Sequence, residues 1–468
     1  MLYIDKKSKT PLYEQLYNSL TNEILSGGLL AGDCLPATRK LSLELSIGRN
    51  TVNKAYQQLV AEGYVQAKMG SGFIVNKLPL ELFPKKTNYA EDLSKEDSPS
   101  SRIDYDFAYG SMDNSLFPYG QWRKSMNNAL SLLEFKESMP YPDKKGEPAL
   151  RQEIARYLKR SRGVSCHPSQ IVITCGQQHS MEIIANIFEY ARSSGKVFAM
   201  EEPGYDGIRA VFINRNYKTI PVPVEKDGIS YEKLEPLDID LLYLTPSHQF
   251  PSGAVLSIAK RQKLIQWAES TDTYLIEDDY DSELRYYTNP VPSMQSLDNY
   301  GRTIYTGTFS KALAPYMRIA YIVFPAALME DYTHYYHRYH SYVTPFHQLA
   351  LADFIRAGSY ERHINRLKTI YRKKHSALVS TINRVFGNKI SIKGGGCGIH
   401  LLLNVKANLC QEELIERAER TGIRVYPTRP LYADASACPE NEILIGFPTI
   451  DENKFDEIFS TLYRVWFS

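Results

Sequence analysis

The chain has 468 residues, which is too many for one compact core, so we expect two or more domains. Hydrophobic residues make up 43% and charged residues 23%, and no apolar run approaches the roughly 20 residues of a membrane-spanning helix. This composition is typical of globular proteins and argues against a membrane protein. The formal net charge of +2 is too small to indicate a nucleic-acid partner, so such a partner must be inferred from local patterns.

Two further features bear on the compartment and on metals. Polar residues begin at Asp5 with no signal-peptide pattern before them, so we expect a cytoplasmic protein. The six cysteines are scattered, without a CxxC pair or a histidine at ligand spacing. We therefore expect reduced, mostly buried thiols and no metal site.

The N-terminal segment has the pattern of three helices. Thr10 and Pro11 predict a helix start, as an N-cap followed by proline in the first turn, and Gly27 ends the helix. A second helix is expected over 37–45, and a third over about 50–61 after the turn at Gly48. In the third helix, one face is apolar and the other carries basic and amide side chains. This is the pattern of a helix-turn-helix.

A predicted β-hairpin follows these helices. Two short β-rich runs flank Lys68-Met-Gly-Ser-Gly72, whose glycines permit a tight turn, and the hairpin would form a wing. Basic residues outnumber acidic ones between residues 36 and 68, which favours phosphate contacts. A small helical protein-binding module is the alternative interpretation.

The same stretch resembles the winged-helix domain of GntR-type bacterial regulators. The resemblance rests on Leu35-Pro-Ala-Thr-Arg-Lys-Leu-Ser, Gly48-Arg-Asn-Thr-Val-Asn-Lys-Ala-Tyr, Ala61-Glu-Gly-Tyr and Gly70-Ser-Gly-Phe. It implies that residues 1–76 bind double-stranded DNA. The implied DNA contacts are Arg39, Arg49 and Thr51, with Lys68 and Gly72 in the wing.

Residues 77–104 are rich in proline, serine and mixed charges and show little hydrophobic period, which predicts a linker. From Asp106 onward, short apolar β-rich runs alternate with helical stretches. Continuous apolar runs such as Ile171-Val-Ile-Thr are typical of buried parallel strands, so we expect an α/β fold over 105–468. The last portion, from about residue 345, mixes helices and strands and predicts a smaller α+β lobe.

Several motifs follow these strands in an order that resembles class I aminotransferases of fold type I. They are Thr174-Cys-Gly-Gln-Gln178, Glu201-Glu-Pro-Gly-Tyr205, Thr245-Pro-Ser-His-Gln-Phe-Pro-Ser-Gly253, Leu275-Ile-Glu-Asp-Asp-Tyr-Asp-Ser-Glu283 and Gly307-Thr-Phe-Ser-Lys311. With the winged helix added, the chain resembles the MocR/GabR-type regulators, in which a GntR domain is fused to an aminotransferase-like domain. The resemblance implies a pyridoxal 5'-phosphate cofactor and a homodimer, possibly domain-swapped, in which each winged helix lies on the partner's large domain.

The chemistry of this cofactor assigns a role to each matching residue. Lys311 would form the Schiff base, Asp278 would face the pyridine nitrogen, and Tyr280 would donate to the phenolic oxygen. Tyr205 would stack on the ring. The phosphate would be held at a helix N-terminus by Gly176 and Gln177, together with Thr308, Ser310 and Arg318. The acids around Asp278 could bind a metal instead, but no histidine accompanies them in the sequence.

Three positions, compared with the family pattern, bear on enzymatic activity and on the identity of the effector. Aminotransferases usually carry asparagine where this chain has Phe250, so we expect at most vestigial transamination. The carboxylate-binding arginine of the family corresponds to Arg429, which would bind an amino-acid effector. A surface salt bridge is the other interpretation of Arg429. Asp206 and Gly207 follow the Pro-Gly-Tyr turn, where some relatives that read γ-aminobutyrate place arginines.

The sequence thus predicts a DNA-binding transcriptional regulator that senses pyridoxal phosphate, in control of vitamin B6 synthesis, or an amino compound that reacts with the cofactor at Lys311. A genuine aminotransferase with a tethered DNA-binding domain is the alternative.

Overall fold

The computed structural model describes residues 4–6, 8–70, 72–78, 102–135, 137–191, 196–287, 291–394 and 396–468. The chain divides into two compact units, Met1–Ser98 and Pro99–Ser468. Most of the predicted linker over 77–104 lies outside the described residues. No helix among the described residues is long and apolar enough to cross a membrane.

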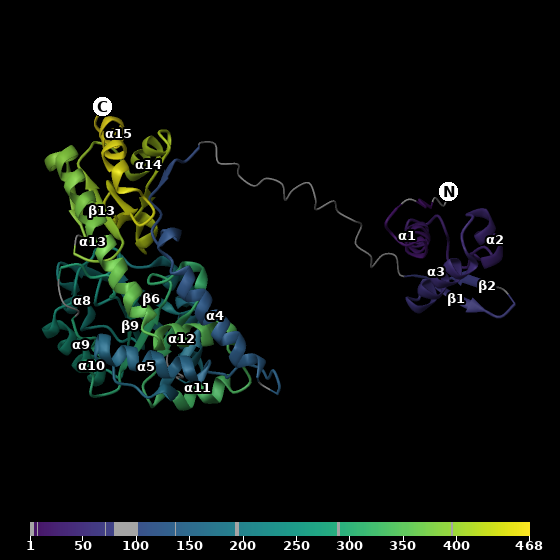
Figure 1. Ribbon diagram of the computed structural model, residues 1–468, viewed down its shortest axis with the longest axis horizontal. Coiled ribbons are helices and arrows are strands. Elements are labelled where there is room, and N and C mark those ends of the chain that lie inside the picture. The colour runs from purple at the N-terminus through teal and green to yellow at the C-terminus, as the bar shows by residue number, and fades with distance from the viewer. Residues whose placement is uncertain are drawn as a thin grey trace. The chain divides into compact units, whose positions relative to one another are not determined.

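The first unit is a three-helix domain followed by a two-stranded hairpin (Figure 1). Its elements are α1 (Leu12–Leu25), α2 (Thr38–Glu44), α3 (Arg49–Ala61), β1 (Val65–Lys68) and β2 (Gly72–Val75). Val52, Tyr56 and Leu59 of α3 are fully buried, as the periodicity predicts. The predicted start of α1 is one residue early. Pro11 has an extended ψ of 140° and is itself the N-cap, so Thr10 lies outside the helix.

The second unit has a large lobe built on a mixed eight-stranded sheet with the order β4-β11-β10-β9-β8-β5-β6-β7. Its elements are α4 (Tyr119–Glu134), α5 (Pro148–Arg162), β4 (Ile171–Thr174), α6 (Gln177–Ala191), β5 (Val197–Glu202), α7 (Asp206–Asn214), β6 (Lys218–Glu225), β7 (Gly228–Ile229), α8 (Tyr231–Leu234), β8 (Leu241–Leu244), α9 (Ile258–Ser270), β9 (Tyr274–Asp279), α10 (Met294–Leu297), β10 (Thr303–Thr308), β11 (Ala320–Val323), α11 (Leu328–Tyr336) and α12 (Pro345–Arg356).

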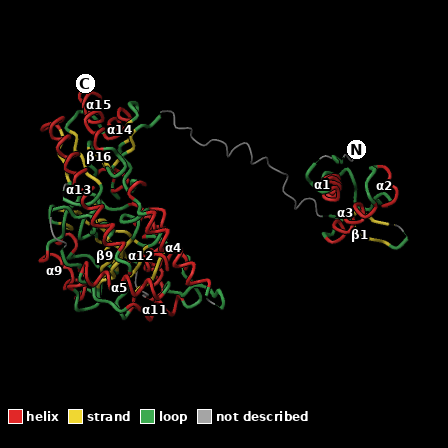
Figure 2. Tube along the Cα trace, viewed as in Figure 1, coloured by secondary structure: helices red, strands yellow, loops and turns green. Residues whose placement is uncertain are grey.

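Helices cover both faces of this sheet (Figure 2). Side chains from α6, α7 and α11 pack on one face, and those from α5, α9 and α12 pack on the other. Alternate residues of one strand serve the two layers: Tyr243 of β8 joins the first core, whereas Leu242 and Leu244 join the second. The α/β prediction is confirmed. The parallel prediction holds for β5, β8, β9 and β10 but not for β4, whose neighbour β11 runs antiparallel to it.

The small lobe contains an antiparallel sheet with the order β12-β13-β16-β15. Its elements are α13 (Ser359–Phe386), β12 (Ile390–Lys393), β13 (His400–Val405), α14 (Gln411–Glu419), β14 (Ile423–Arg424), β15 (Tyr426–Pro427), β16 (Glu442–Gly446) and α15 (Phe455–Phe467), with β3 (Tyr105–Asp106) paired to β14. The predicted boundary near residue 345 is too early, because α12 packs in the core of the large lobe. The long helix α13 contributes to both cores, through Tyr360 in one and Tyr371 in the other (Figure 1).

The six cysteines are free thiols, as expected. Only Cys397 and Cys438 are buried, however, so the expectation of mostly buried thiols is wrong. Cys34 is exposed in the first unit, and Cys175 lies at the end of β4 with its Sγ atom 3.3 Å from Nδ1 of His179.

Candidate functional site

The carboxyl ends of the strands β5, β8, β9 and β10 meet at one edge of the large sheet, because these strands run parallel. A cavity of about 430 Å³ opens at this edge. Every residue that the sequence assigns to the cofactor lines it except Gly176, which lies behind Arg318. The predicted cofactor residues are therefore brought together from segments spread over residues 176–318.

Lys311 follows the end of β10 and reaches into the cavity. Its Nζ atom lies 4.0 Å from the centre of the Tyr109 ring. Burial lowers the pKa of Lys311 to about 8, although Asp281 and Asp278 oppose this shift. A lysine with this pKa is partly neutral near pH 7, and the neutral amine is the form that attacks an aldehyde.

Asp278 stands at the carboxyl end of β9 with one carboxylate oxygen paired and one not. Oδ2 accepts a hydrogen bond of 2.5 Å from the hydroxyl of Tyr243, whereas Oδ1 is buried with no hydrogen-bond partner among the described residues. Burial raises the pKa of Asp278 to about 7. A buried, unpaired carboxylate oxygen is costly, and a cationic N–H donor in the cavity would relieve that cost.

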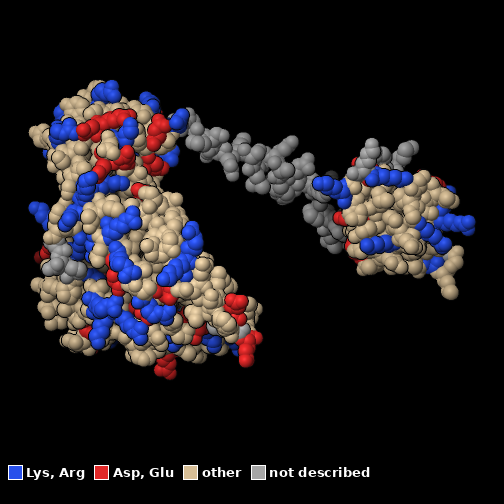
Figure 3. All heavy atoms as spheres, viewed as in Figure 1, with Lys and Arg blue, Asp and Glu red and all other residues tan. Residues whose placement is uncertain are grey.

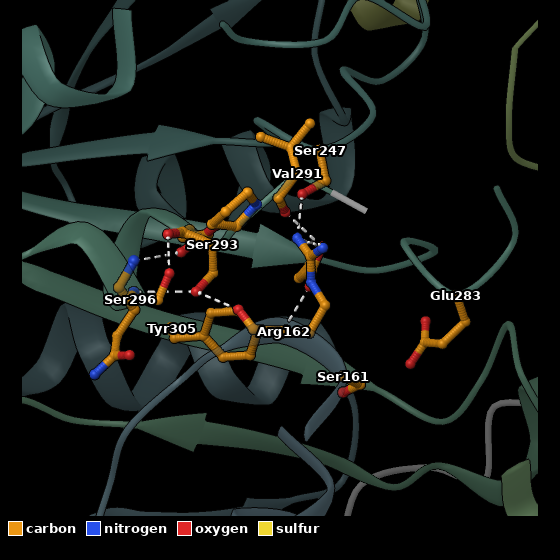
Figure 4. Close-up of polar contacts among 12 residues, drawn as sticks. Ser161, Arg162, Ser247, Glu283, Val291, Ser293, Ser296 and Tyr305 are labelled. Carbon is orange, nitrogen blue, oxygen red and sulfur yellow. Dashed lines mark hydrogen bonds and ion pairs between the residues drawn. The ribbon is translucent and has the colours of Figure 1, made fainter. Parts of the chain in front are cut away.

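The neighbouring acid, Asp279, is fully paired and faces away from the cavity. Arg162 at the end of α5 donates to Oδ2 of Asp279 at 2.6 Å, and the Tyr305 hydroxyl donates to the same atom at 2.5 Å. Arg162 also donates to Ser247 Oγ at 2.6 Å and to the carbonyl of Val291 at 2.8 Å (Figure 4). Burial opposes the charge of Asp279, but Arg162 lowers its pKa below the ordinary value. This ion pair keeps Asp279 charged, and the Asp279 charge adds to the burial that raises the pKa of Asp278.

The other acids of this segment also have partners of their own. Glu277 accepts hydrogen bonds of 2.9 Å from the backbone of Met294 and Gln295 at the start of α10. Asp281 pairs with Nδ1 of His248 at 2.7 Å. No histidine stands near these acids in the sequence, but the fold places His248 and His400 beside Asp281. The premise that no histidine accompanies the acids is therefore wrong. The ligand atoms of these two histidines and Asp281 lie within 4.8 Å of one another.

A polar corner of the cavity combines a helix N-terminus with an arginine. Gly176, at a φ of +117°, precedes α6 and lies against the Arg318 guanidinium, where a Cβ atom would come within 2.3 Å of Nη2. The hydroxyls of Thr308 and Ser310 are 3.1 Å apart. Free helix amides, an arginine and two hydroxyls are the donors that a phosphate group needs. Gln177 also lines the cavity.

Aromatic side chains form another part of the cavity wall. Tyr205 precedes α7, and its ring centre lies 6.0 Å from that of Phe250, which in turn lies 4.6 Å from that of Tyr109. Sequence reasoning missed Tyr109 and Tyr243. Tyr243 could have been found, because it lies near the carboxyl end of a predicted strand. Tyr109 belongs to the segment that joins the two lobes, and no local pattern marks it.

Arg429 does not line this cavity. Its Nη1 atom forms an ion pair of 2.8 Å with Oε1 of Glu412 at the start of α14, and the side chain is 41% exposed. The two residues border a separate shallow hollow. The structure thus shows the salt bridge, and the assignment of Arg429 to an effector carboxylate stays a prediction.

In the first unit, the predicted DNA-contact residues lie on the elements expected for them. Arg39 is on α2, Arg49 and Thr51 begin α3, and Lys68 pairs with Gly72 across the hairpin. All are exposed except Thr51, which is half-buried. Neither arginine forms an ion pair within the part of the chain that the structure describes. The face of this unit shown in Figure 3 carries many Lys and Arg side chains and few acidic ones.

Comparisons with known proteins agree with this arrangement. Residues 12–75 match the family model "Bacterial regulatory proteins, gntR family", and residues 106–462 match "Aminotransferase class I and II". The chain belongs to the MocR-type regulators. It is 37% identical to the uncharacterized HTH-type transcriptional regulator YhdI of Bacillus subtilis over 99% of this chain and 97% of that protein. It is 32% identical to the probable rhizopine catabolism regulatory protein MocR of Rhizobium meliloti, over 99% and 95%.

Of two further matches, one is to a regulator and the other is to the structure of an enzyme. The chain is 30% identical to the pyridoxine biosynthesis regulator PdxR of Corynebacterium glutamicum, over 95% of this chain and 93% of that protein. Among solved structures, Pyrococcus horikoshii kynurenine aminotransferase matches with a TM-score of 0.70 and 24% identity, over 82% of this chain and 95% of that one. The second match shows the fold alone. The first unit is thus a GntR winged helix, and the chain is a DNA-binding transcriptional regulator with an aminotransferase fold.

Proposed function

We propose that the second unit binds pyridoxal phosphate at Lys311 and that cofactor binding, or reaction of an amine at this site, changes DNA binding by the winged helix. The observation that carries the proposal is Asp278 Oδ1, buried without a partner on the same cavity as the low-pKa amine of Lys311. Pyridoxal phosphate would supply an aldehyde for Lys311 and a protonated ring nitrogen for Asp278. The Arg318 corner would hold its phosphate.

The residues around the cavity fit this cofactor at each end. Asp278, its other oxygen held by Tyr243, is positioned to keep a proton on a ring nitrogen. Gly176, Thr308 and Ser310 leave room and donors for phosphate oxygens beside Arg318. The aromatic wall of Tyr109, Tyr205 and Phe250 would exclude water from the ring.

Two effector models follow from the same site. In the first, pyridoxal phosphate is itself the signal, as the name of the relative PdxR suggests for that protein. Among the residues that line the cavity, Lys311 and Arg318 are the only cations, and Asp206 follows Tyr205 where an arginine would favour a carboxylate. In the second model, an amino acid reacts at the cofactor and draws Arg429 away from Glu412. We favour the first model.

A working aminotransferase is the second candidate function. The fold and the Lys311–Asp278 pair favour it, whereas Phe250 places no hydrogen-bond donor where the family's enzymes carry asparagine. Rapid conversion of the bound cofactor by common amino acids would support the enzyme. We further propose that the regulator acts in the cytoplasm as a homodimer that binds two half-sites on DNA, and mass measurement in solution tests the oligomeric state.

The deciding experiment records the visible spectrum and the DNA affinity of the full-length chain before and after addition of pyridoxal phosphate. The DNA is a site selected from a random pool by the protein itself. We expect an absorbance band that Lys311→Ala removes, and a DNA affinity that changes with the cofactor in the wild type alone. A band without any effect on DNA would exclude the first effector model. The absence of a band would refute the cofactor site.

A further inference from the structure

A buried histidine behind the cavity wall joins two residues at the end of β9. Nδ1 of His248 lies 2.7 Å from Oδ2 of Asp281 and 3.1 Å from the hydroxyl of Tyr280. The exposed fractions are 2% for His248 and Asp281 and 8% for Tyr280. Of the three, only Tyr280 lines the cavity. His248 and Asp281 therefore act on the cavity through Tyr280.

The chemistry of the three groups fixes the direction of their hydrogen bonds. The Asp281 carboxylate can only accept, so the Nδ1 atom of His248 carries a proton. Burial opposes the charge of His248, but Asp281 raises its pKa to about 10, so this proton stays in place near neutral pH. The same N–H is shared with the hydroxyl oxygen of Tyr280, 3.1 Å away, as the longer arm of a three-centre hydrogen bond. A hydroxyl has one proton, and the Tyr280 proton is then free to be donated into the cavity.

Two other titratable groups lie around His248. His400 on β13 faces it with ring centres 5.1 Å apart, and burial lowers the pKa of His400 well below the ordinary value, so that ring is neutral. Nε2 of His400 lies 3.1 Å from the carbonyl of Pro251. The remaining titratable neighbour is the thiol of Cys397. Asp281 is thus the one carboxylate that pairs with His248 among the described residues.

We propose that His248 and Asp281 are a positioning pair that fixes the Tyr280 hydroxyl as a hydrogen-bond donor to the phenolic oxygen of the bound cofactor. This inference rests on the proposed function. Phe250 occupies the neighbouring part of the wall and has no donor, so Tyr280 is the group left to serve that oxygen. The pair would keep the donor in one orientation when the cavity is occupied.

A metal ion held by His248, Asp281 and His400 is the competing use of the same atoms. The hydrogen bond argues against a metal at Nδ1, because a metal there would have to displace the proton that His248 shares with Asp281. Metal content is therefore one outcome of the test.

The test compares full-length wild type with His248→Leu, His248→Asn, Tyr280→Phe and the His248→Leu/Tyr280→Phe double variant. Asparagine can keep an N–H donor near the position of Nδ1. Each protein is titrated with pyridoxal phosphate, and the pH midpoint of the visible band is recorded. We expect His248→Leu to weaken cofactor affinity about tenfold, which is the effect of one lost hydrogen bond. The pH midpoint of this variant should rise. A phenolic oxygen that loses its hydrogen-bond donor carries more negative charge and holds the proton beside it more tightly.

The controls separate positioning from general damage. We expect His248→Asn to keep most of the wild-type affinity and midpoint, and the double variant to match Tyr280→Phe, because His248 acts through that hydroxyl. Asp281→Asn should shift the midpoint in the same direction as His248→Leu, and it tests the pair if the leucine variant does not fold.

The inference is overturned if His248→Leu and Asp281→Asn behave as wild type, or if the effect of His248→Leu persists in full without the Tyr280 hydroxyl. Stoichiometric metal in the wild type that His248→Leu removes would also overturn it. A wild type that shows no band refutes the proposed function itself, and this inference with it.

Discussion

In the first unit, Arg39, Arg49 and Lys68 are exposed on short helices and a hairpin. Each of them belongs to the local sequence pattern that predicted it. In the second unit, Lys311 and Asp278 line a cavity between segments distant in the sequence, with a further layer of buried charge behind them. Exposed charges retain their hydration and cost the fold little, whereas buried charges are tolerated only with partners. The DNA-binding residues should therefore tolerate substitution, and those around the cavity should not.

The largest expected effect is on the buried ion pair behind the cavity. Arg162→Met removes the partner of Asp279 and leaves an unpaired buried carboxylate, so it should lower the free energy of unfolding by about 3–5 kcal/mol. Because Arg162 holds the pKa of Asp279 down, the stability from this pair is present above the unfolded pKa and is lost as the pH falls. Denaturant unfolding of wild type and variant from pH 7 to pH 3 measures both effects. An unchanged stability at pH 7 would contradict the contrast between the two units.

The next effect concerns Asp278, whose pKa is shifted the opposite way. Asp278→Asn should stabilise the cofactor-free protein by on the order of 2 kcal/mol at pH 8, because it removes a buried charge. A carboxyl whose pKa is raised by folding does not destabilise the protein below its unfolded pKa, and the destabilisation grows as the pH rises to about 7. The stabilisation by Asp278→Asn should therefore vanish near pH 4. The same variant should bind pyridoxal phosphate roughly thirtyfold more weakly, for the loss of about 2 kcal/mol from a charged hydrogen bond. Urea unfolding and cofactor titration give the two numbers, and a variant with no gain at pH 8 would show that Asp278 is not strained.

A smaller effect is expected on DNA. Arg49→Ala should weaken DNA binding by about 1–3 kcal/mol and, if Arg49 contacts a phosphate, lower the salt slope by about 1. Its stability and cofactor spectrum should equal those of the wild type. Arg420→Ala, an exposed arginine of the second unit, is the matched control. Equal DNA affinities for the two variants would remove Arg49 from the interface.

The smallest effect belongs to the surface pair of Arg429. Glu412→Gln should change the free energy of unfolding by less than about 1 kcal/mol, because the pair is exposed. In the amino-acid effector model, it should also raise the affinity for a carboxylate effector a few-fold by releasing Arg429. A screen of amino acids against the DNA affinity of both proteins tests this, and no response in either leaves pyridoxal phosphate as the signal.

The sequence predicted much of the candidate site because its residues follow strand ends. Asp278 at the carboxyl end of β9 and Lys311 after β10 could be placed at one edge from the alternation of strands and helices alone. The antiparallel β11 was not foreseen, so β4 was wrongly expected to pair with a parallel strand. Burial periodicity cannot tell a parallel strand from an antiparallel one, because both faces are covered in either case.

By itself, the sequence determined the kind of protein, because the winged-helix pattern and the order of motifs around Lys311 are local and survive without coordinates. Only the tertiary structure decided which acid has a free oxygen. Asp278 and Asp279 are neighbours with the same chemistry, and Arg162 and Tyr305 reach one of them from distant segments. The structure alone also set His248 beside Asp281 and Arg429 beside Glu412. The partners of a charge depend on packing between remote parts of the chain, which no local pattern encodes.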